Sequence, residues 1–240
     1  MMSYEKLKHI LFIDIETVAS FPSFDLLDSR LQHLWEKKTK NLRVEQPPQE
    51  AYTDRAAIYA EFGKILVIGV GFFAELNGEL VFRCKSIAGE DEGALLDSFS
   101  ALLDQLPAKE NWRLCAHNGK EFDFPYICRR LLIHARPLPR LLQIMGKKPW
   151  DTPQLIDTME LWKFGDIKAY TSLELMAASL GVPTSKDDID GSEVGKVYFS
   201  TGDVNRIAQY CQKDVAVMAQ VLMRLLGLGH LHQDCIYYNA

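Results

Sequence analysis

The sequence predicts an α/β protein, because strand-like and helix-like apolar patterns alternate along the chain. Short apolar runs such as "ILVIGVGFFA" are typical of buried strands, while residues 91–106 place leucines on one stripe at helical spacing. With 240 residues, 48% of them hydrophobic, the chain can build a sizeable core. The sequence contains no internal repeat and no linker that divides it. One α/β domain over residues 1–240 is therefore the economical prediction.

Four segments have the composition of strands. The first runs from His9 to Glu16. Residues 64–74 and 79–87 follow, and the turn-forming Asn77-Gly78 pair between them predicts a hairpin. Residues 112–118 form another short strand.

Five later segments have the apolar periodicity of helices. Acidic residues open the first of them, Pro125 lies in the first turn of the second, where proline is favoured, and Gly181 ends the fourth. In chain order these helical segments are 91–106, 122–135, 151–164, 172–181 and 203–226.

Residues from about 20 to 63 form a long insertion between the first and second strands. The segment is polar, has "QPPQ" in its middle, and is predicted to be helical on both sides of it. The sequence leaves two roles open for this insertion, because it could cover an active site or dock a partner.

The composition favours a cytoplasmic protein. Five widely spaced cysteines, without a CxxC pair, are typical of a reducing compartment and exclude a disulfide framework or a zinc knuckle. The first apolar stretch is too short for a signal peptide, and the longest, of ten residues, is too short to cross a bilayer. The net charge is −5, but residues 124–150 contain six basic residues and no acidic one, so the charge is unevenly distributed along the chain.

Acidic residues occur where apolar ones are expected. Asp14 and Glu16 interrupt the first strand at i and i+2, so both point to one face of the sheet. Asp214 lies in the core-facing stripe of the last helix, and Tyr210 precedes it by one turn on the same side. A buried carboxylate needs a partner, which makes Asp214 the hardest of these acids to explain as a surface residue.

Two further acids have alternative explanations. Asp123 lies between two phenylalanines at the start of a helix, where it would also serve as an N-cap. Asp157, in "LIDTMELW", has a structural interpretation, in which it caps a helix or lies on its surface, and a functional one. Taken together, such acids match the oxygen ligands that Mg²⁺ or Mn²⁺ prefers, and a cluster of them can hold two ions.

Three motifs carry a resemblance to a known family. "FIDIET", "HNGKEFDFPYI" and "YCQKD" resemble, in order, the motifs of the DEDD (DnaQ-like) superfamily of 3′–5′ exonucleases, which have an RNase H-like fold. The chain is most similar to small bacterial predicted 3′–5′ exonucleases related to the proofreading domain of family B DNA polymerases. "SLELMAASLGVP" and "KDDIDGSEV" also resemble the stretch before the third motif. The resemblance implies a central mixed five-stranded sheet flanked by helices.

The resemblance also implies roles for particular residues. The four metal-binding and catalytic acids of the family fall on Asp14, Glu16, Asp123 and Asp214. Of these, Asp14, Glu16 and Asp214 would hold the ion that activates water, and Asp14 would bridge to a second ion on which Asp123 acts largely through water. A tyrosine at i−4 from the last acid places the chain in the tyrosine branch.

The tyrosine of that branch corresponds to Tyr210, which would orient the attacking water. A phenol with a pKa of about 10 is a poor base at neutral pH, so positioning is the expected role. Thr17 and Asn118 match positions near the terminal nucleotide, and Phe122 is a packing or stacking residue.

The resemblance therefore implies an enzyme that removes nucleoside 5′-monophosphates from the 3′ end of a single-stranded nucleic acid with two Mg²⁺ or Mn²⁺ ions. DNA is favoured as the substrate, and the basic stretch from Arg129 to Lys148 would contact its backbone. An RNA 3′-processing exoribonuclease and an inactive nucleic-acid-binding module are the alternatives. No membrane partner is expected, and any polymerase or repair protein would be a separate chain.

Overall fold

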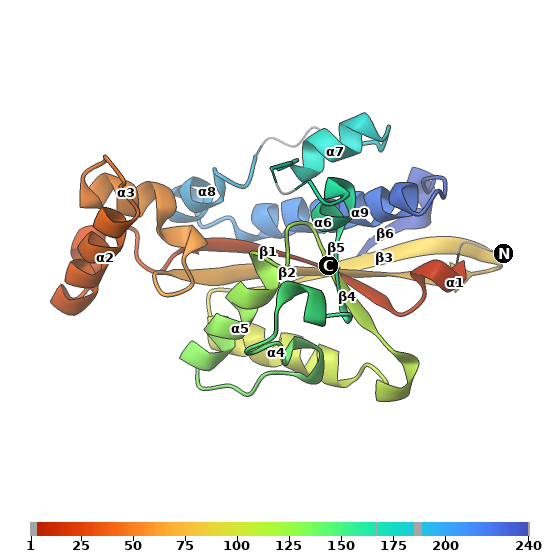
Figure 1. The fold of residues 1–240 in the computed structure, drawn as a ribbon, viewed down its shortest axis with the longest axis horizontal. Coiled ribbons are helices and arrows are strands. Elements are labelled where there is room, and N and C mark those ends of the chain that lie inside the picture. The colour runs from red at the N-terminus through yellow and green to blue at the C-terminus, as the bar shows by residue number, and fades with distance from the viewer. Residues whose placement is uncertain (1–3, 167, 185–188, 240) are drawn as a thin grey trace.

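The computed structural model describes residues 4–166, 168–184 and 189–239 of the chain. Its centre is a six-stranded mixed sheet with the strand order β5-β4-β1-β2-β3-β6 (Figure 1). The strands are β1 Ile10–Ala19, β2 Gly63–Leu76, β3 Glu79–Ala88, β4 Arg113–Ala116, β5 Leu155–Asp157 and β6 Ile236–Asn239. The predicted α/β class with flanking helices is confirmed.

Strand β1 lies inside the sheet and has a different type of neighbour on each edge. It pairs antiparallel with β2 along most of its length, and β2 and β3 form the predicted hairpin. On the other edge it pairs in parallel with β4, but only through Ile10–Phe12. The second half of β1 therefore runs past the end of β4, and no strand among the described residues lies beside this edge of its backbone.

Helices cover both faces of the sheet. Helices α4 and α5 lie on one face, while the long helix α9 lies along the other with α8 beside it (Figure 1). The helices are α1 Tyr4–Leu7, α2 Ser29–Asn41, α3 Pro48–Arg55, α4 Glu92–Asp104, α5 Asp123–Ile133, α6 Thr158–Lys163, α7 Leu173–Ser179, α8 Val194–Thr201 and α9 Val204–Leu225.

Local chemistry explains where these helices begin and which side they bury. Asp91 and Asp203 accept hydrogen bonds from the backbone N–H groups of the first turns of α4 and α9, as N-cap residues do. In α9 the predicted core-facing stripe is buried, with Ile207, Cys211 and Met218 at most 1% exposed. Apolar burial on this scale is what holds a helix against a sheet.

The sheet differs from the expected five strands by having six. The extra strand is β6, which pairs in parallel with β3 at the edge of the sheet. Residues 151–164 were predicted to be entirely helical. Strand β5 lies within this segment, and only the second half of the segment forms α6. Both strands are too short to show an alternating pattern, and backbone pairing with β3 and β4 determines them instead.

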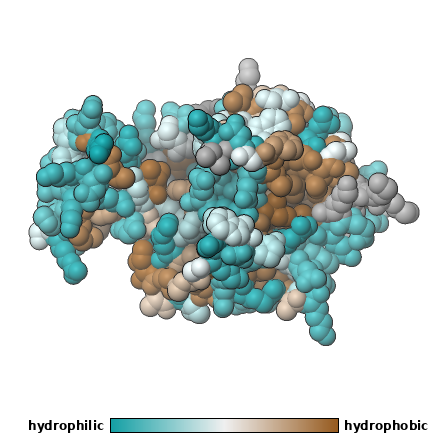
Figure 2. Space-filling model, in the orientation of Figure 1, coloured by the Kyte–Doolittle hydropathy of each residue, from teal (hydrophilic) through white to brown (hydrophobic). Residues whose placement is uncertain are grey.

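The insertion between β1 and β2 forms a lobe that contains α2 and α3, on either side of "QPPQ" as predicted. The Ser20 N–H donates to the Phe62 carbonyl oxygen at 2.8 Å, which closes the base of the lobe. Inside it, Trp35 and Tyr52 are completely buried and stack edge to face. The lobe projects at the left of Figure 1, and Figure 2 shows it there as a largely hydrophilic surface.

Within "KDDIDGSEV", residues 186–188 lie outside the described residues, and α8 begins at its last residue, Val194. Among the described helices, none combines the length and the apolar character needed to cross a membrane.

Candidate active site

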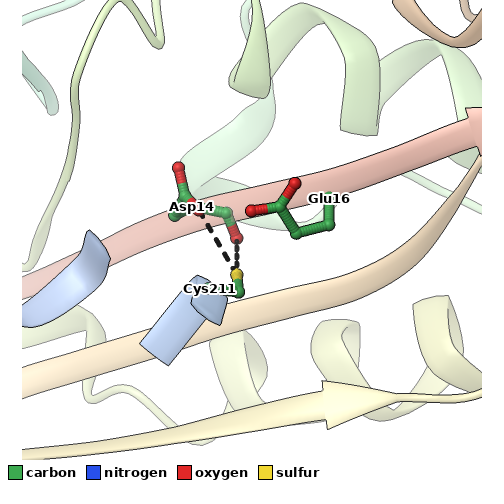
Figure 3. Close-up of side chains that lie close together, drawn as sticks. All are labelled: Asp14, Glu16 and Cys211. Carbon is green, nitrogen blue, oxygen red and sulfur yellow. Dashed lines mark hydrogen bonds between the residues drawn. The ribbon is translucent and has the colours of Figure 1, made fainter. Parts of the chain in front are cut away.

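The first part of the site is the second half of β1, which runs past the end of β4. Asp14 and Glu16 point to the face covered by α9, as their i, i+2 spacing predicts (Figure 3). Asp14 lies opposite Gly69 of β2. A Cβ atom on Gly69 would lie 2.8 Å from Cys211 Sγ, so this glycine allows α9 to approach the sheet closely. The register of β1 against β2 then shifts between Glu16 and Thr17.

Helix α9 brings the second part of the site to β1. Tyr210 and Asp214 are one turn apart on this helix, and Cys211 lies between them in sequence. The Cys211 thiol is 3.3 Å from Oδ2 and 3.5 Å from the main-chain oxygen of Asp14 (Figure 3). This contact joins residues that are 197 positions apart and fixes the helix against the acidic part of the strand.

Asp123 reaches the site from the opposite side of β1. Its Oδ1 atom accepts a hydrogen bond from the Ile15 N–H at 3.2 Å, and the side chain is only 4% exposed. The Ile15 N–H is available because β4 has already ended at this point of the edge. Asp123 is the first residue of α5 rather than its N-cap, so the capping alternative is wrong. A single backbone amide, located between Asp14 and Glu16, anchors the third acid.

The acids repel one another strongly. Burial raises the pKa of Asp14 well above its ordinary value, and the charges of Asp123 and Asp214 raise it further. Burial and the same neighbouring charges, with that of Asp14, raise the pKa of Glu16. Burial also raises the pKa of Asp123, to about 7. Within the described part of the chain, no lysine or arginine forms a salt bridge with any of these three carboxyl groups.

This arrangement fits a divalent cation. Asp14, Glu16 and Cys211 each offer a ligand atom, and these atoms lie within 4.8 Å of one another. Burial and the charge of Asp14 raise the pKa of Cys211, so its sulfur keeps its proton. The ionisable ligands are therefore carboxylate oxygens, which hard cations such as Mg²⁺ and Mn²⁺ prefer.

Tyr210 lies against the same acids. Burial raises the pKa of its hydroxyl above the ordinary value, and the charges of Asp214 and Glu16 raise it further. A hydrogen bond to Asp214 acts in the same direction. The hydroxyl therefore remains protonated at neutral pH and can donate or orient a hydrogen bond, but it cannot act as a base.

All the predicted site residues line one cleft of about 1320 Å³. Three segments far apart in the sequence contribute them: β1, the turn from β4 into α5, and α9. In chain order they are Asp14, Glu16, Thr17, Asn118, Phe122, Asp123, Tyr210 and Asp214. The insertion lobe forms one wall of this cleft through Thr53, Asp54, Ala57 and Ile58. The two roles left open for the insertion were to cover an active site or to dock a partner. The structure places the insertion beside the site.

Several residues that line the cleft were not predicted from the sequence, among them His117, Tyr170 and Lys196. His117 follows β4, Tyr170 is 71% exposed in the loop before α7, and Lys196 lies on α8. The His117 ring contacts the Thr158 hydroxyl at 2.8 Å and the Thr171 carbonyl oxygen at 2.9 Å, so it fastens the loop that carries Tyr170. A histidine directly after a strand was a usable signal, whereas a lone surface lysine gives none.

Asp157 has a structural role. It caps α6, and its Oδ1 atom accepts from the Met159 and Glu160 N–H groups. The same carboxylate accepts from the N–H groups of Asn118 and Lys120, each at 3.0 Å. Asp157 therefore holds the turn that presents Asn118 to the cleft, where Asn118 has a left-handed backbone with φ of 58°. Of the two interpretations of Asp157, the cap is confirmed.

The basic stretch does not act as one surface. Arg130 is buried and forms a salt bridge with Glu92, and Arg136 pairs with Asp97 at 2.9 Å. These two arginines connect α5 and the turn after it to α4. Arg130 is buried, Arg136 is partly exposed but paired, and neither lines the cleft. The other cations of the stretch lie outside the cleft.

Comparisons with known proteins agree with this geometry. Residues 60–234 match the model of a family described as predicted 3′–5′ exonucleases related to the exonuclease domain of PolB. The match includes Asp123, Tyr210 and Asp214 but begins after Asp14 and Glu16. No curated protein matches the sequence significantly.

A solved structure of similar fold is the family B DNA polymerase from the hyperthermophilic archaeon Pyrobaculum calidifontis. The superposition has a TM-score of 0.55 at 14% sequence identity. It covers 90% of this chain but only 24% of the polymerase chain. At this identity the likeness concerns the fold, and it agrees with an RNase H-like arrangement.

Proposed function

Because the chain belongs to the family of predicted 3′–5′ exonucleases related to the exonuclease domain of PolB, we propose that it is a metal-dependent exonuclease acting on single-stranded DNA. It would hydrolyse the terminal phosphodiester bond at the 3′ end and release nucleoside 5′-monophosphates. The active-site residues in this proposal are the four acids and Tyr210.

One observation carries the proposal. Carboxylates from β1, α5 and α9 converge in one cleft although burial raises the pKa values of Asp14, Glu16 and Asp123, and the charges of the neighbouring acids raise those of Asp14 and Glu16 further. Folding alone gains nothing from such an arrangement, because each buried charge costs free energy unless it is compensated. A bound cation is the compensation that the ligand atoms fit, so the cluster is best explained by the chemistry it performs.

The metal ligands in this proposal are Asp14, Glu16, Asp123 and Asp214. When bound, two Mg²⁺ or Mn²⁺ ions would supply positive charge that stabilises the attacking and leaving oxygens of phosphoryl displacement. The chain holds these carboxylates in advance. Asp14 and Glu16 are fixed by the strand, and Asp123 is fixed by its hydrogen bond to the Ile15 N–H.

Tyr210 would orient the attacking water with its hydroxyl group. The raised pKa of Tyr210 keeps its hydroxyl protonated, so this phenol would not accept the proton that the attacking water releases. Thr17, Asn118 and Phe122 would bind the terminal nucleotide, since all three line the cleft beside the acids. Lys196 and Tyr170, on the remaining walls, would add a phosphate contact and a stacking surface.

The test uses 5′-labelled single-stranded DNA and RNA of one sequence, incubated with Mn²⁺ or with EDTA. We expect a ladder that shortens stepwise from the 3′ end of the DNA, is lost with EDTA, and is lost in the Asp14→Ala variant. Glu75→Ala, which removes an exposed acid from the neighbouring strand, is the matched control and should retain activity.

Three results would contradict the proposal: cleavage that persists in EDTA, cuts inside the strand rather than from its 3′ end, or full activity of Asp14→Ala. A faster ladder on RNA would identify an exoribonuclease. Binding of both nucleic acids without any cleavage would identify a binding module.

A further inference from the structure

A second hollow lies on the other side of the first turn of α5. We call it the basic hollow; its volume is about 390 Å³. Its floor is mainly apolar, and its rim carries cationic side chains. The floor is formed by Cys128, Leu132, Leu138, Ile144 and Leu155, and the rim by Lys120, Arg129, Lys147 and Lys148.

The cations on this rim are largely uncompensated. Lys120 forms a salt bridge with Glu160. In the described part of the chain, Arg129, Lys147 and Lys148 form no salt bridge with any carboxylate. Arg130 of the same stretch is buried and paired with Glu92, and the partly exposed Arg136 is paired with Asp97, whereas Arg129, Lys147 and Lys148 are exposed. An exposed cluster of like charge is suited to an anionic partner.

Exposed apolar side chains adjoin these cations. Met145 and Trp150 are each 73% exposed, and Lys148 Nζ lies 5.2 Å from the centroid of the Trp150 ring. An indole face beside an ammonium group offers a stacking surface for a base together with a contact for its phosphate. Neither group contributes to the core, since both lie at the surface.

The basic hollow is adjacent to the active-site cleft along the chain. Phe122 and Asp123 line the cleft, and Pro125 of the same helical turn lines the hollow. Asn118 lines the cleft and Lys120 the hollow, so their backbones are at most roughly 7 Å apart. A polymer whose end lies in the cleft would therefore have only this turn to cross before it reached the hollow.

We propose that the basic hollow binds the single strand a few nucleotides upstream of the 3′ end. Lys147 and Lys148 would contact its phosphates, and a base would stack on Trp150. This inference rests on the proposed exonuclease function and extends it by a second binding site on the same strand. An acidic peptide would satisfy the charges as well, but the continuity with the cleft and the indole beside Lys148 favour a nucleotide.

The experiment measures kcat/KM for single-stranded DNA substrates from 2 to about 12 nucleotides in length. The variants are Trp150→Ala and the double variant Lys147→Glu/Lys148→Glu. A matched double variant, Lys85→Glu/Lys109→Glu, makes the same change in net charge at exposed lysines on β3 and before β4. Trp150→Phe retains an aromatic ring and tests the stacking contact.

We expect kcat/KM of the wild type to rise with length until the strand reaches the hollow. Trp150→Ala should lower the value for the longest substrate about tenfold and leave the shortest substrate unchanged, with recovery in Trp150→Phe. The Lys147→Glu/Lys148→Glu variant should flatten the length dependence, whereas the control pair should retain it. An unchanged length dependence in both variants, or equal losses on all lengths, would overturn the proposal.

Binding without turnover separates this inference from the proposed function. With EDTA present, fluorescence anisotropy of a labelled 12-nucleotide DNA at several salt concentrations reports phosphate contacts directly. In the variants Lys147→Gln and Lys148→Gln, the slope of log affinity against log salt should each time become smaller in magnitude by about 0.7. If no substrate is hydrolysed but this slope becomes smaller, the proposed function is wrong and DNA binding in the basic hollow is supported. An unchanged slope would show that the basic hollow does not bind DNA, and an acidic peptide would then be the ligand that its charges fit.

Discussion

At Asp14, burial, the charges of Asp123 and Asp214, and the Cys211 thiol act on one carboxyl group. The first two raise its pKa and the thiol contact lowers it, with burial the largest influence. Because the folded-state pKa is raised, the native protein keeps a proton that the unfolded chain releases above a pH of about 4. The metal-free protein should therefore lose stability as the pH rises from about 4 through the folded-state pKa.

Asp14→Asn should separate stability from activity. The amide cannot ionise, so we expect the melting temperature in EDTA at pH 8 to rise by about 2–4 °C for each kcal/mol of repulsion removed. The difference from the wild type should shrink at pH 5, and exonuclease activity should be lost at both pH values. Thermal unfolding at the two pH values checks this, and a variant that melts below the wild type at pH 8 would contradict it.

Tyr210 offers a second test at the level of a single residue. Tyr210→Phe removes the hydroxyl that would orient water, and we expect kcat to fall about 100-fold while the KM for DNA changes little. Because the raised pKa keeps the phenol protonated, no limb of the pH–rate profile should disappear with it. Tyr198→Phe on neighbouring α8, whose hydroxyl accepts from Lys64, is the control. Unchanged turnover in Tyr210→Phe would remove this residue from the mechanism.

Single residues also show how far the sequence could predict the site. Asp14 and Glu16 follow from strand periodicity, and Asp214 with Tyr210 follows from helical periodicity, because both spacings determine which face a side chain occupies. Asp123 and Asp157 stand at the starts of two helices and look alike in sequence. What distinguishes them is a long-range partner, the Ile15 N–H for one and the Asn118 N–H for the other, and no local pattern encodes such a partner.

Among the secondary-structure elements, the longest ones were the most predictable. The last helix was expected at 203–226 and runs over Val204–Leu225, since its length gives the apolar stripe several repeats. Strands β5 and β6 were missed because three or four residues cannot show a period. Helix α8 carries Lys196 and Phe199 to the cleft, yet its sequence gave no sign of that position, which depends on how α8 packs beside α9 and β1.

The turn between β4 and α5 allows a test of how one element positions another. Asp157→Ala removes an acceptor shared by four backbone N–H groups, at Asn118, Lys120, Met159 and Glu160. We expect the free energy of unfolding to fall by about 3 kcal/mol and the KM for DNA to rise, because Asn118 loses its support. Urea denaturation and steady-state kinetics measure the two effects.

The control for that variant is Ser172→Ala, which removes the single capping bond at the start of α7. It should cost about 1 kcal/mol. If Asp157→Ala costs no more than Ser172→Ala, then the carboxylate does not hold the turn.

For the molecule as a whole, a buried cluster around Glu92 joins parts that are distant in sequence. Glu92 of α4 accepts from the Ile65 N–H of β2 and from Arg130 of α5, and Arg130 also donates to the Ala60 carbonyl oxygen at the end of the insertion lobe. Burial alone raises the pKa of Glu92, but the hydrogen bonds from Arg130 and Ile65 lower it overall. Its contribution to stability is therefore present above a pH of about 4 and is lost as the pH falls through the lowered folded-state value.

Glu92→Gln should show how much this cluster contributes to the free energy of unfolding, because it leaves the Arg130 charge buried without its partner. We expect a loss of about 3–5 kcal/mol and weaker acid dependence below pH 4 than in the wild type. Asp97→Asn, which breaks an exposed Arg136 pair between neighbouring segments, should cost at most about 1 kcal/mol. Equal losses in the two variants, measured by urea denaturation, would show that burial does not distinguish them.

The contacts that assemble the acids also set an order of events during synthesis. Ile15 and Asp123 are 108 positions apart, and Asp14 and Cys211 are 197 apart. Contacts of such long range form late, because the intervening chain must be ordered first. β1 is made before its partners, and Asp14 can meet Cys211 only after α9 has been made. A nascent chain therefore carries only part of the acidic cluster until α9 has been made, and the proposed active site is complete only after that.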